Sequence, residues 1–168
     1  VLETLNMDVS SYTALLRTVK QKLRNFQDLR PRPGLDNKII AAWNGLMLKA
    51  LSDAGLYLNN PTYLQQAEKL ASWIQENLWQ NNTLFRIYSR GKATIPAFLE
   101  DYACIAEGFT ALYTATGKPE YAHFAKTLTD RAIHKFRDAE TGAFYFSPED
   151  GENLIVRKTD LSDDVINS

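Results

Sequence analysis

The feature that most limits how this chain can fold is an internal duplication with an offset of 58 residues. Residues 60–63 (Asn-Pro-Thr-Tyr) match residues 118–121 (Lys-Pro-Glu-Tyr), and at the same offset Ala67 aligns with Ala125. Each unit contains an apolar helix pattern, a proline-containing turn, an amphipathic helix pattern and a long loop. A repeat of this kind predicts an array of αα-hairpins. The two units cover about residues 36–97 and 98–158.

The two helices of each unit differ in how their apolar residues are distributed. The helices expected over about 36–58 and 98–113 are apolar on nearly all sides, whereas those over 61–78 and 119–136 are apolar on one side only. A helix that is apolar all round is surrounded by protein. The alternation therefore predicts an all-α fold in which the αα-hairpins form part of an α/α toroid, with inner helices enclosed by outer ones, as in six-hairpin glycosidases.

The chain is shorter than a closed toroid. Such a ring needs about six hairpins, roughly twice the residues present. We therefore expect a single domain over residues 1–168 that is an incomplete toroid. Its open edges would expose the apolar surface of inner helices, which favours dimerisation through these edges.

Other segments have weaker patterns. An amphipathic helix is expected after Asp8, over about residues 12–26. The long loops carry strand patterns, so short β-hairpins are expected there, and a further helix is expected to begin near the C-terminal end. The strand patterns cover residues 84–88, 144–146 and 153–158, with turns at Asn81-Asn82 and Gly91, and the helix start covers 160–164.

The segment from Arg30 to Leu51 joins a basic, proline-spaced loop to the first apolar helix. Prolines at 31 and 33 favour an extended approach, and Asp36 precedes the apolar run, so it is predicted to be the helix N-cap. Gly45 in the middle of the helix should cost about 1 kcal/mol relative to alanine. Another helix or a ligand is therefore expected to approach the backbone closely at this position.

This segment resembles a motif of the spermatogenesis-associated, thioredoxin-domain-containing family, R-P-R-P-x-L-D-(D/N)-K followed by W-N-G-L-M. The matching residues are Arg30 to Pro33, Leu35 to Lys38 and Trp43 to Met47. A second family-like block, F-L-(D/E)-D-Y-A, is present as Phe98 to Ala103. The resemblance extends from about Lys22 to the end of the chain. It implies an α/α toroid preceded, in the family, by a thioredoxin-like domain that is absent here, and it suggests a connection with sugars.

The predicted toroid fold indicates where a functional site would lie. Every inner helix is entered from a long loop, so the inner-helix N-termini should lie at the same end of the ring, which we call the mouth. Carboxylates, aromatic rings and arginines would meet there, a mixture that suits carbohydrates, and two carboxylates can divide acid and base roles. The catalytic candidates are Asp101, Glu100 and Asp36, and the substrate-binding candidates are Trp43, Asn44, Arg30, Arg32, Lys38, Tyr102 and Arg86; Tyr88, Arg157, Asp163 and Asp164 would lie nearby.

Simpler interpretations exist for each of these residues. The aspartates at 36, 163 and 164 are also plain N-cap candidates, and Glu100 and Asp101 would suit the helix dipole without catalysis. The ring of Trp43 and the tyrosines could belong to the core, and Arg30 and Arg32 could pair with nearby acids. Cys104 is expected to be a small buried hydrophobe. The two histidines, His123 and His134, are expected at the surface or rim of an outer helix.

Composition excludes several classes of function. The net charge of −1 at pH 7 gives no electrostatic basis for binding nucleic acid or an anionic membrane. A single cysteine cannot form an internal disulfide, and no Cys/His spacing typical of a metal site occurs, so neither a metal nor a cofactor is expected. No signal peptide and no apolar run long enough to span a bilayer is evident, so a cytoplasmic location is expected.

Two interpretations of function follow. In the first, the chain is part of a carbohydrate-active toroid, similar to glycosidases or to sugar 2-epimerases, with acid/base carboxylates at the mouth. In the second, it is a non-catalytic helical-repeat scaffold that binds a protein or supports a neighbouring domain. An enzyme should converge polar groups at the inner-helix N-termini, whereas a scaffold should display its interaction surface along helix faces. Redox chemistry cannot be assigned, because the chain contains no dithiol.

Overall fold

The computed structural model describes residues 7–149, 151 and 156–159. The chain forms two compact units, Val1–Asp36 and Asn37–Ser168, which are described separately. Among the described residues of the first unit, helix α2 (Val9–Asp28) forms as the amphipathic pattern predicts. The carboxylate of Asp8 caps it by accepting the Ser11 N–H at 2.9 Å, and hydrogen bonds from Ser10 and Ser11 lower the pKa of Asp8. No residue of α2 is buried.

The second unit contains two αα-hairpins that follow the sequence duplication. They are formed by α3 (Ala41–Tyr57) with α4 (Pro61–Asn77), and by α5 (Leu99–Thr116) with α6 (Pro119–Phe136). The start of α5 follows the start of α3 by 58 residues, and the same offset separates α6 from α4. Pro61 and Pro119 occupy the first turns of α4 and α6, where a missing N–H costs nothing.

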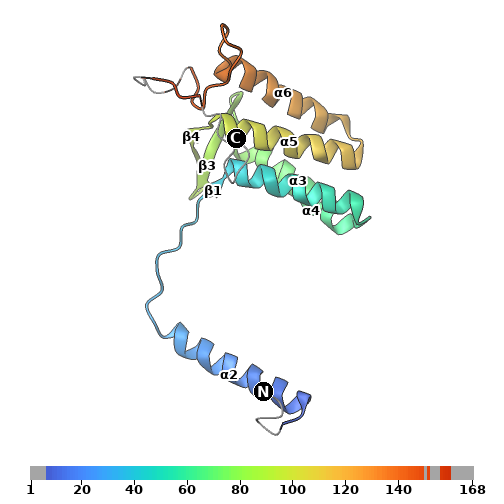
Figure 1. Ribbon diagram of the computed structural model, residues 1–168, viewed down its shortest axis with the longest axis vertical. Helices are drawn as coiled ribbons and strands as arrows, with labels where there is room; N and C mark the ends of the chain where they lie inside the picture. Colours follow the sequence, from blue (N-terminus) through green and yellow to red (C-terminus); the bar gives the residue numbers. More distant parts are fainter. Residues whose placement is uncertain (1–6, 150, 152–155, 160–168) are drawn as a thin grey trace. The chain divides into compact units, whose positions relative to one another are not determined.

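The apolar helices α3 and α5 lie side by side and parallel, while α4 packs against α3 and α6 against α5 (Figure 1). Two glycines allow the close approach. A Cβ on Gly45 would lie 2.4 Å from the carbonyl carbon of Cys104, and one on Gly108 would lie 2.7 Å from the carbonyl oxygen of Gly45. The expectation that a second helix approaches the backbone at Gly45 is therefore confirmed. The arrangement is the inner and outer layering of an α/α toroid.

The core of this unit lies between the two layers. Most of its members are apolar side chains of the four helices and of β3, and many of the large ones expose no more than 1% of their surface. They include Leu48, Ile74, Leu84, Tyr102, Phe109, Leu112, Leu128 and Phe136. In the part of the chain that the structure describes, no helix has both the length and the apolar character needed to cross a bilayer.

Four short strands lie at the end of the unit where α3 and α5 begin (Figure 1). The central one is β3 (Thr83–Ser89), which pairs antiparallel with β1 (Ile39–Ile40), β2 (Trp79–Gln80) and β4 (Lys92–Pro96). The strand and both turns expected in this region are present, and Asn81, Asn82 and Gly91 have positive φ angles. The pairing of β1 and β2 with β3 was not predicted from the sequence, because two-residue strands carry no periodicity.

The predicted N-cap role of Asp36 is wrong. Helix α3 begins at Ala41, and its N-cap, Ile40, makes no side-chain capping bond. The residues between Asp36 and the helix are extended instead, because Ile39 and Ile40 pair with Tyr88 and Ile87 of β3. Sheet pairing with a distant segment thus overrides the local capping signal.

The strand predicted over 144–146 is reduced to a single bridge between Arg137 and Phe144. Of the strand predicted over 153–158, residues 156–158 are described and are not a strand, and residues 153–155 lie outside the described residues. The helix start expected over 160–164 also lies outside them.

Candidate functional site

The N-terminal ends of α3 and α5 meet at the carboxylate of Asp101. This side chain is fully buried and accepts three hydrogen bonds: from the Ala42 N–H at 3.1 Å, the Phe98 N–H at 3.0 Å and the Arg86 guanidinium at 2.9 Å. Ala42 is in the first turn of α3, and Phe98 is the N-cap of α5. One carboxylate therefore satisfies backbone donors at the starts of two helices and joins them to β3 through Arg86.

The electrostatics of this cluster balance burial against hydrogen bonding. Burial raises the pKa of Asp101, while the N–H groups of Phe98 and Ala42 and the positive charge of Arg86 oppose the shift. Burial also acts to lower the pKa of Arg86, but the carboxylates of Glu100 and Asp101 outweigh it, so that this pKa is raised. Three donors facing one carboxyl group are the arrangement that an ionised aspartate requires.

Glu100 is the carboxylate of the cluster that reaches solvent. Its Oε1 lies 2.5 Å from Nη1 of Arg86, and the two side chains keep 26% and 24% of their surfaces exposed. The Arg86 guanidinium also lies over the ring of Phe98, with its central carbon 5.1 Å from the ring centre. Glu100 and Arg86 therefore form an ion pair that is partly exposed to solvent.

Trp43 and Asn44 lie in the same first turn of α3 as Ala42, whose N–H binds Asp101. The Trp43 side chain is 60% exposed, so it lies outside the core. Asn44 is half-buried, and its side-chain amide donates to the carbonyl of Ile40 at 2.8 Å. The structure thus brings Trp43, Asn44, Arg86, Glu100 and Asp101 to one end of the α3/α5 pair.

Other candidates lie nearby or elsewhere. Lys38 precedes β1 and lies next to Asn37, whose side chain accepts a hydrogen bond from Ser89 at the end of β3. Tyr102 lies in the core, where its hydroxyl accepts the Leu84 N–H at 3.1 Å and its ring packs against Phe136, so it is closed to a ligand in this arrangement.

Tyr88 is half-buried and packs edge-on against Trp73. Arg157 lies over the ring of Tyr145 and donates to the carbonyls of Lys135 and Ser147. Both side chains therefore take part in packing of the unit.

Arg30, Arg32 and Asp36 belong to the first unit, so their part in the site stays a prediction. Arg32 pairs with Asp28, and the guanidinium of Arg30 lies over the ring of Phe26. The interpretation in which Arg32 pairs with a nearby acid is therefore confirmed. The two aspartates at 163 and 164 lie outside the described residues.

Cys104 is buried in the contact of α5 with α3, as expected for a small hydrophobe. Burial, followed by the negative charges of Glu100, Asp101 and Glu107, raises the pKa of its thiol to about 11. At pH 8 only about one thiol in a thousand is then ionised, and the thiolate is the reactive form.

We expect a disulfide reagent to modify Cys104 at least about 100-fold more slowly in the folded protein than in urea. The modification rate is measured by absorbance in both states, and equal rates would show that the thiol is accessible in the folded protein.

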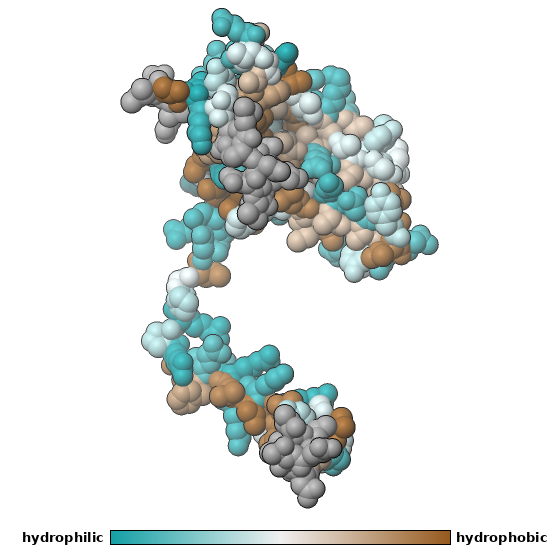
Figure 2. Space-filling view, in the orientation of Figure 1, coloured by the Kyte–Doolittle hydropathy of each residue, from teal (hydrophilic) through white to brown (hydrophobic). Residues whose placement is uncertain are grey.

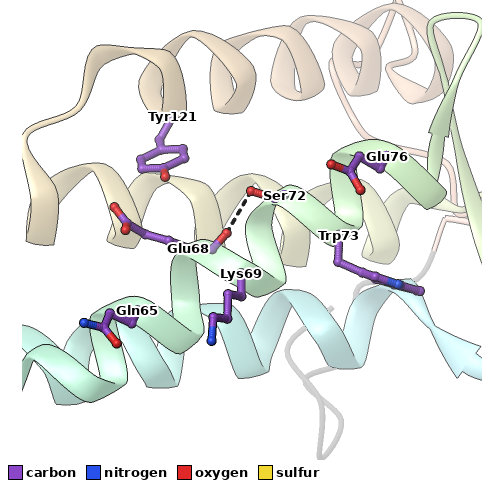
Figure 3. A pocket seen from close by; sticks show the side chains of 7 residues that line it. All are labelled: Gln65, Glu68, Lys69, Ser72, Trp73, Glu76 and Tyr121. Atoms are coloured by element: carbon purple, nitrogen blue, oxygen red, sulfur yellow. Dashed lines mark hydrogen bonds between the residues drawn. The ribbon is translucent and has the colours of Figure 1, made fainter.

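A shallow depression lies away from the mouth, on α4. It is lined by Gln65, Glu68, Lys69, Ser72, Trp73, Glu76 and, from α6, Tyr121 (Figure 3). None of these residues was predicted from the sequence to form a site, because most of them are polar residues of an outer helix. Within the described residues, no group of three histidine, cysteine, aspartate or glutamate side chains is gathered as a metal site would require.

The chain is similar in sequence to proteins named spermatogenesis-associated protein 20. It is 31% identical to the rat protein and 29% identical to the human one, in each case over 94% of this chain and 21% of the relative. It is also 32% identical to an uncharacterised Caenorhabditis elegans protein, over 86% of this chain and 21% of that protein. The chain thus spans about a fifth of the length of these relatives. No protein-family model matches it.

Solved structures with a similar fold are α/α-toroid proteins. A cellobiose 2-epimerase from Spirochaeta thermophila matches with a TM-score of 0.60 and 20% identity, over 66% of this chain and 31% of the epimerase. The GH76 α-mannanase BT2949 of Bacteroides thetaiotaomicron matches with a TM-score of 0.56 and 17% identity, over 70% and 32% of the two chains. These likenesses confirm the toroid fold predicted from the alternation of helices. Over nearly its whole length the chain is similar to a part of spermatogenesis-associated protein 20, which confirms the family resemblance of its motifs.

Proposed function

We propose that this chain supplies part of the sugar-binding mouth of a carbohydrate-active α/α toroid. One observation carries the proposal. The exposed ring of Trp43 and the partly exposed pair of Glu100 and Arg86 are held at the same end of the inner helices, through the contact of Asp101 with Ala42. An aromatic ring, a carboxylate and a guanidinium at one end of a helix pair are the kinds of group that take up the apolar face and the hydroxyls of a sugar ring.

The roles within this site follow from burial. Glu100 is the carboxylate that a ligand can reach, so we assign it the acid/base or hydroxyl-binding role. Asp101 has no exposed surface, and its two oxygens already accept three hydrogen bonds. We therefore assign Asp101 the role of positioning Arg86 and the two helix ends. The names of the structural neighbours, which include cellobiose 2-epimerase, D-mannose isomerase and α-mannanase, make a sugar the ligand class to test first.

A non-catalytic scaffold is the second candidate, and one observation favours it. The polar groups of the mouth satisfy one another, and the depression of Figure 3 lies on α4 rather than at the mouth. In a scaffold the Arg86 cluster would serve only to fix the starts of α3 and α5. The two candidates differ in whether a small ligand binds near Trp43.

Calorimetric titration with mono- and disaccharides separates the two candidates. We expect saturable binding with a Kd of about 1 mM, which corresponds to about 4 kcal/mol. Trp43→Ala and Glu100→Gln should each abolish it without unfolding the protein. Tyr57→Ala is the matched control, because Tyr57 is a 79% exposed aromatic residue at the opposite end of the same helix. A folded chain that binds no sugar, or that loses binding equally in all three variants, would favour the scaffold.

A further inference from the structure

Ile95 has a backbone conformation that its own side chain makes unfavourable. Its φ angle is +63°, although it lies within β4 and not in a turn. Two features oppose this conformation, because a branched side chain crowds the backbone in the left-handed region and a following proline favours an extended conformation. Pro96 is that proline. A strained residue of this kind persists only where the surrounding structure holds it, and such residues cluster at functional sites.

The other positive φ angles have local explanations. Among the described residues they occur at glycines, at three asparagines and at Arg90. Glycine has no Cβ, and asparagine tolerates the left-handed region. Arg90 and Gly91 form the two-residue turn between β3 and β4, a turn type that requires positive φ angles. Within the described part of the chain, Ile95 is therefore the one β-branched residue in this conformation.

Strand pairing holds the backbone of Ile95 in place. Before it, Thr94 pairs with Ile87 of β3, and after it the Ala97 N–H donates to the Leu84 carbonyl at 2.9 Å. These contacts fix the chain on both sides of the strained residue. A glycine at the same position would adopt the conformation without strain. The course of the backbone therefore does not explain why this position carries a branched side chain.

The core does not explain the side chain either. Ile95 keeps 49% of its surface exposed and does not belong to the core of the unit. Figure 2 shows apolar surface on the side of the unit where Figure 1 draws β3 and β4. An apolar side chain is thus held at the surface, on a backbone that would be more stable without it.

The position of Ile95 suggests what the side chain contacts. The pairs on either side of it in the β3/β4 ladder place it opposite Arg86. Opposite residues of two strands have Cα atoms about 5 Å apart. The Arg86 side chain and its partner Glu100 are both partly exposed. Ile95 therefore adds an exposed apolar group next to the ion pair of the mouth.

We propose that Ile95 is a ligand-contacting residue of the mouth. Its side chain contacts the C–H groups of a sugar whose hydroxyls bind Glu100 and Arg86, and the strained backbone holds it in position. This inference rests on the proposed function and adds a residue that determines specificity. A branched apolar side chain favours a sugar that presents C–H groups at this point over one that presents a hydroxyl, because the hydroxyl would lose its hydrogen bonds to water.

Thermal unfolding and calorimetric titration with cellobiose and D-mannose test the proposal. Ile95→Gly removes both the strain and the side chain, so it should unfold at a higher temperature than wild type but bind sugar at least about tenfold more weakly. Ile95→Val keeps a branched apolar side chain and should resemble wild type in both measurements. Thr94→Gly is the matched control, because Thr94 is an exposed, branched residue of the same strand without a positive φ angle. It should unfold at a lower temperature and bind sugar like wild type.

The outcomes separate this inference from the proposed function. A wild-type chain that binds neither sugar would overturn both. Wild-type binding that Ile95→Gly retains would overturn the role of Ile95 alone and leave the proposed site standing. An Ile95→Gly protein that unfolds at a lower temperature than wild type, as the Thr94→Gly control should, would show that the side chain serves stability, and would also overturn the inference.

Discussion

Replacing Asp101 with asparagine should lower the free energy of unfolding by about 3 kcal/mol. The buried carboxylate accepts the N–H groups of Ala42 and Phe98 and pairs with Arg86. Asparagine has the same shape, but its amide nitrogen is a donor and would face one of these donors. The change also leaves the partly buried Arg86 with one carboxylate instead of two. Urea unfolding followed by circular dichroism measures the loss.

Glu100→Gln is the matched control, because Glu100 binds the same guanidinium but keeps a quarter of its surface exposed. We expect it to cost less than about 1 kcal/mol. Measured together with the sugar titration, the two variants distinguish a residue that holds the helices in place from a residue that contacts the ligand. Asp101→Asn should mainly lower the free energy of unfolding, and Glu100→Gln should mainly weaken sugar binding. Similar stabilities for the two variants would contradict the assignment of Asp101 as the residue that joins the helices.

Replacing Gly45 with alanine should lower the free energy of unfolding by about 2 kcal/mol. In a helix interior, replacing glycine with alanine normally raises the free energy of unfolding by about 1 kcal/mol. Here the new Cβ would lie 2.4 Å from the Cys104 carbonyl carbon and 2.6 Å from the Ile105 nitrogen, and both are backbone atoms of a packed helix. They cannot rotate away, so α3 and α5 must separate, at a cost of about 3 kcal/mol.

Gly34→Ala is the control for the Gly45 variant, because nothing lies within 4 Å of a Cβ at that position. We expect a change within about 0.5 kcal/mol. Thermal unfolding of both variants alongside wild type gives the comparison. A Gly45→Ala protein that is as stable as wild type, or more stable, would show that α3 and α5 are not packed this closely in solution.

Helix identity was predictable because it depends on local pattern. Three features are visible in the sequence without any knowledge of tertiary contacts: the apolar spacing of α3 to α6, the prolines at the starts of α4 and α6, and the offset of 58 residues. Even the close approach at Gly45 has a local signal, because a glycine in the middle of a helix is costly unless something needs the space. The layered fold followed from the alternation of these helices.

The sequence by itself determined the helices, their duplication and the layering of apolar and amphipathic elements, because these depend on residues a few positions apart. Only the tertiary structure decided where α3 begins, since Ile39 and Ile40 pair with a strand distant in sequence. It also decided that Asp101 is a buried anchor, because one of its donors, Ala42, is 59 residues away. In a helix that is apolar on all sides, the sequence does not indicate which side is covered. The exposure of Trp43 was therefore decided by the position of α5, which packs against the Gly45 side of α3.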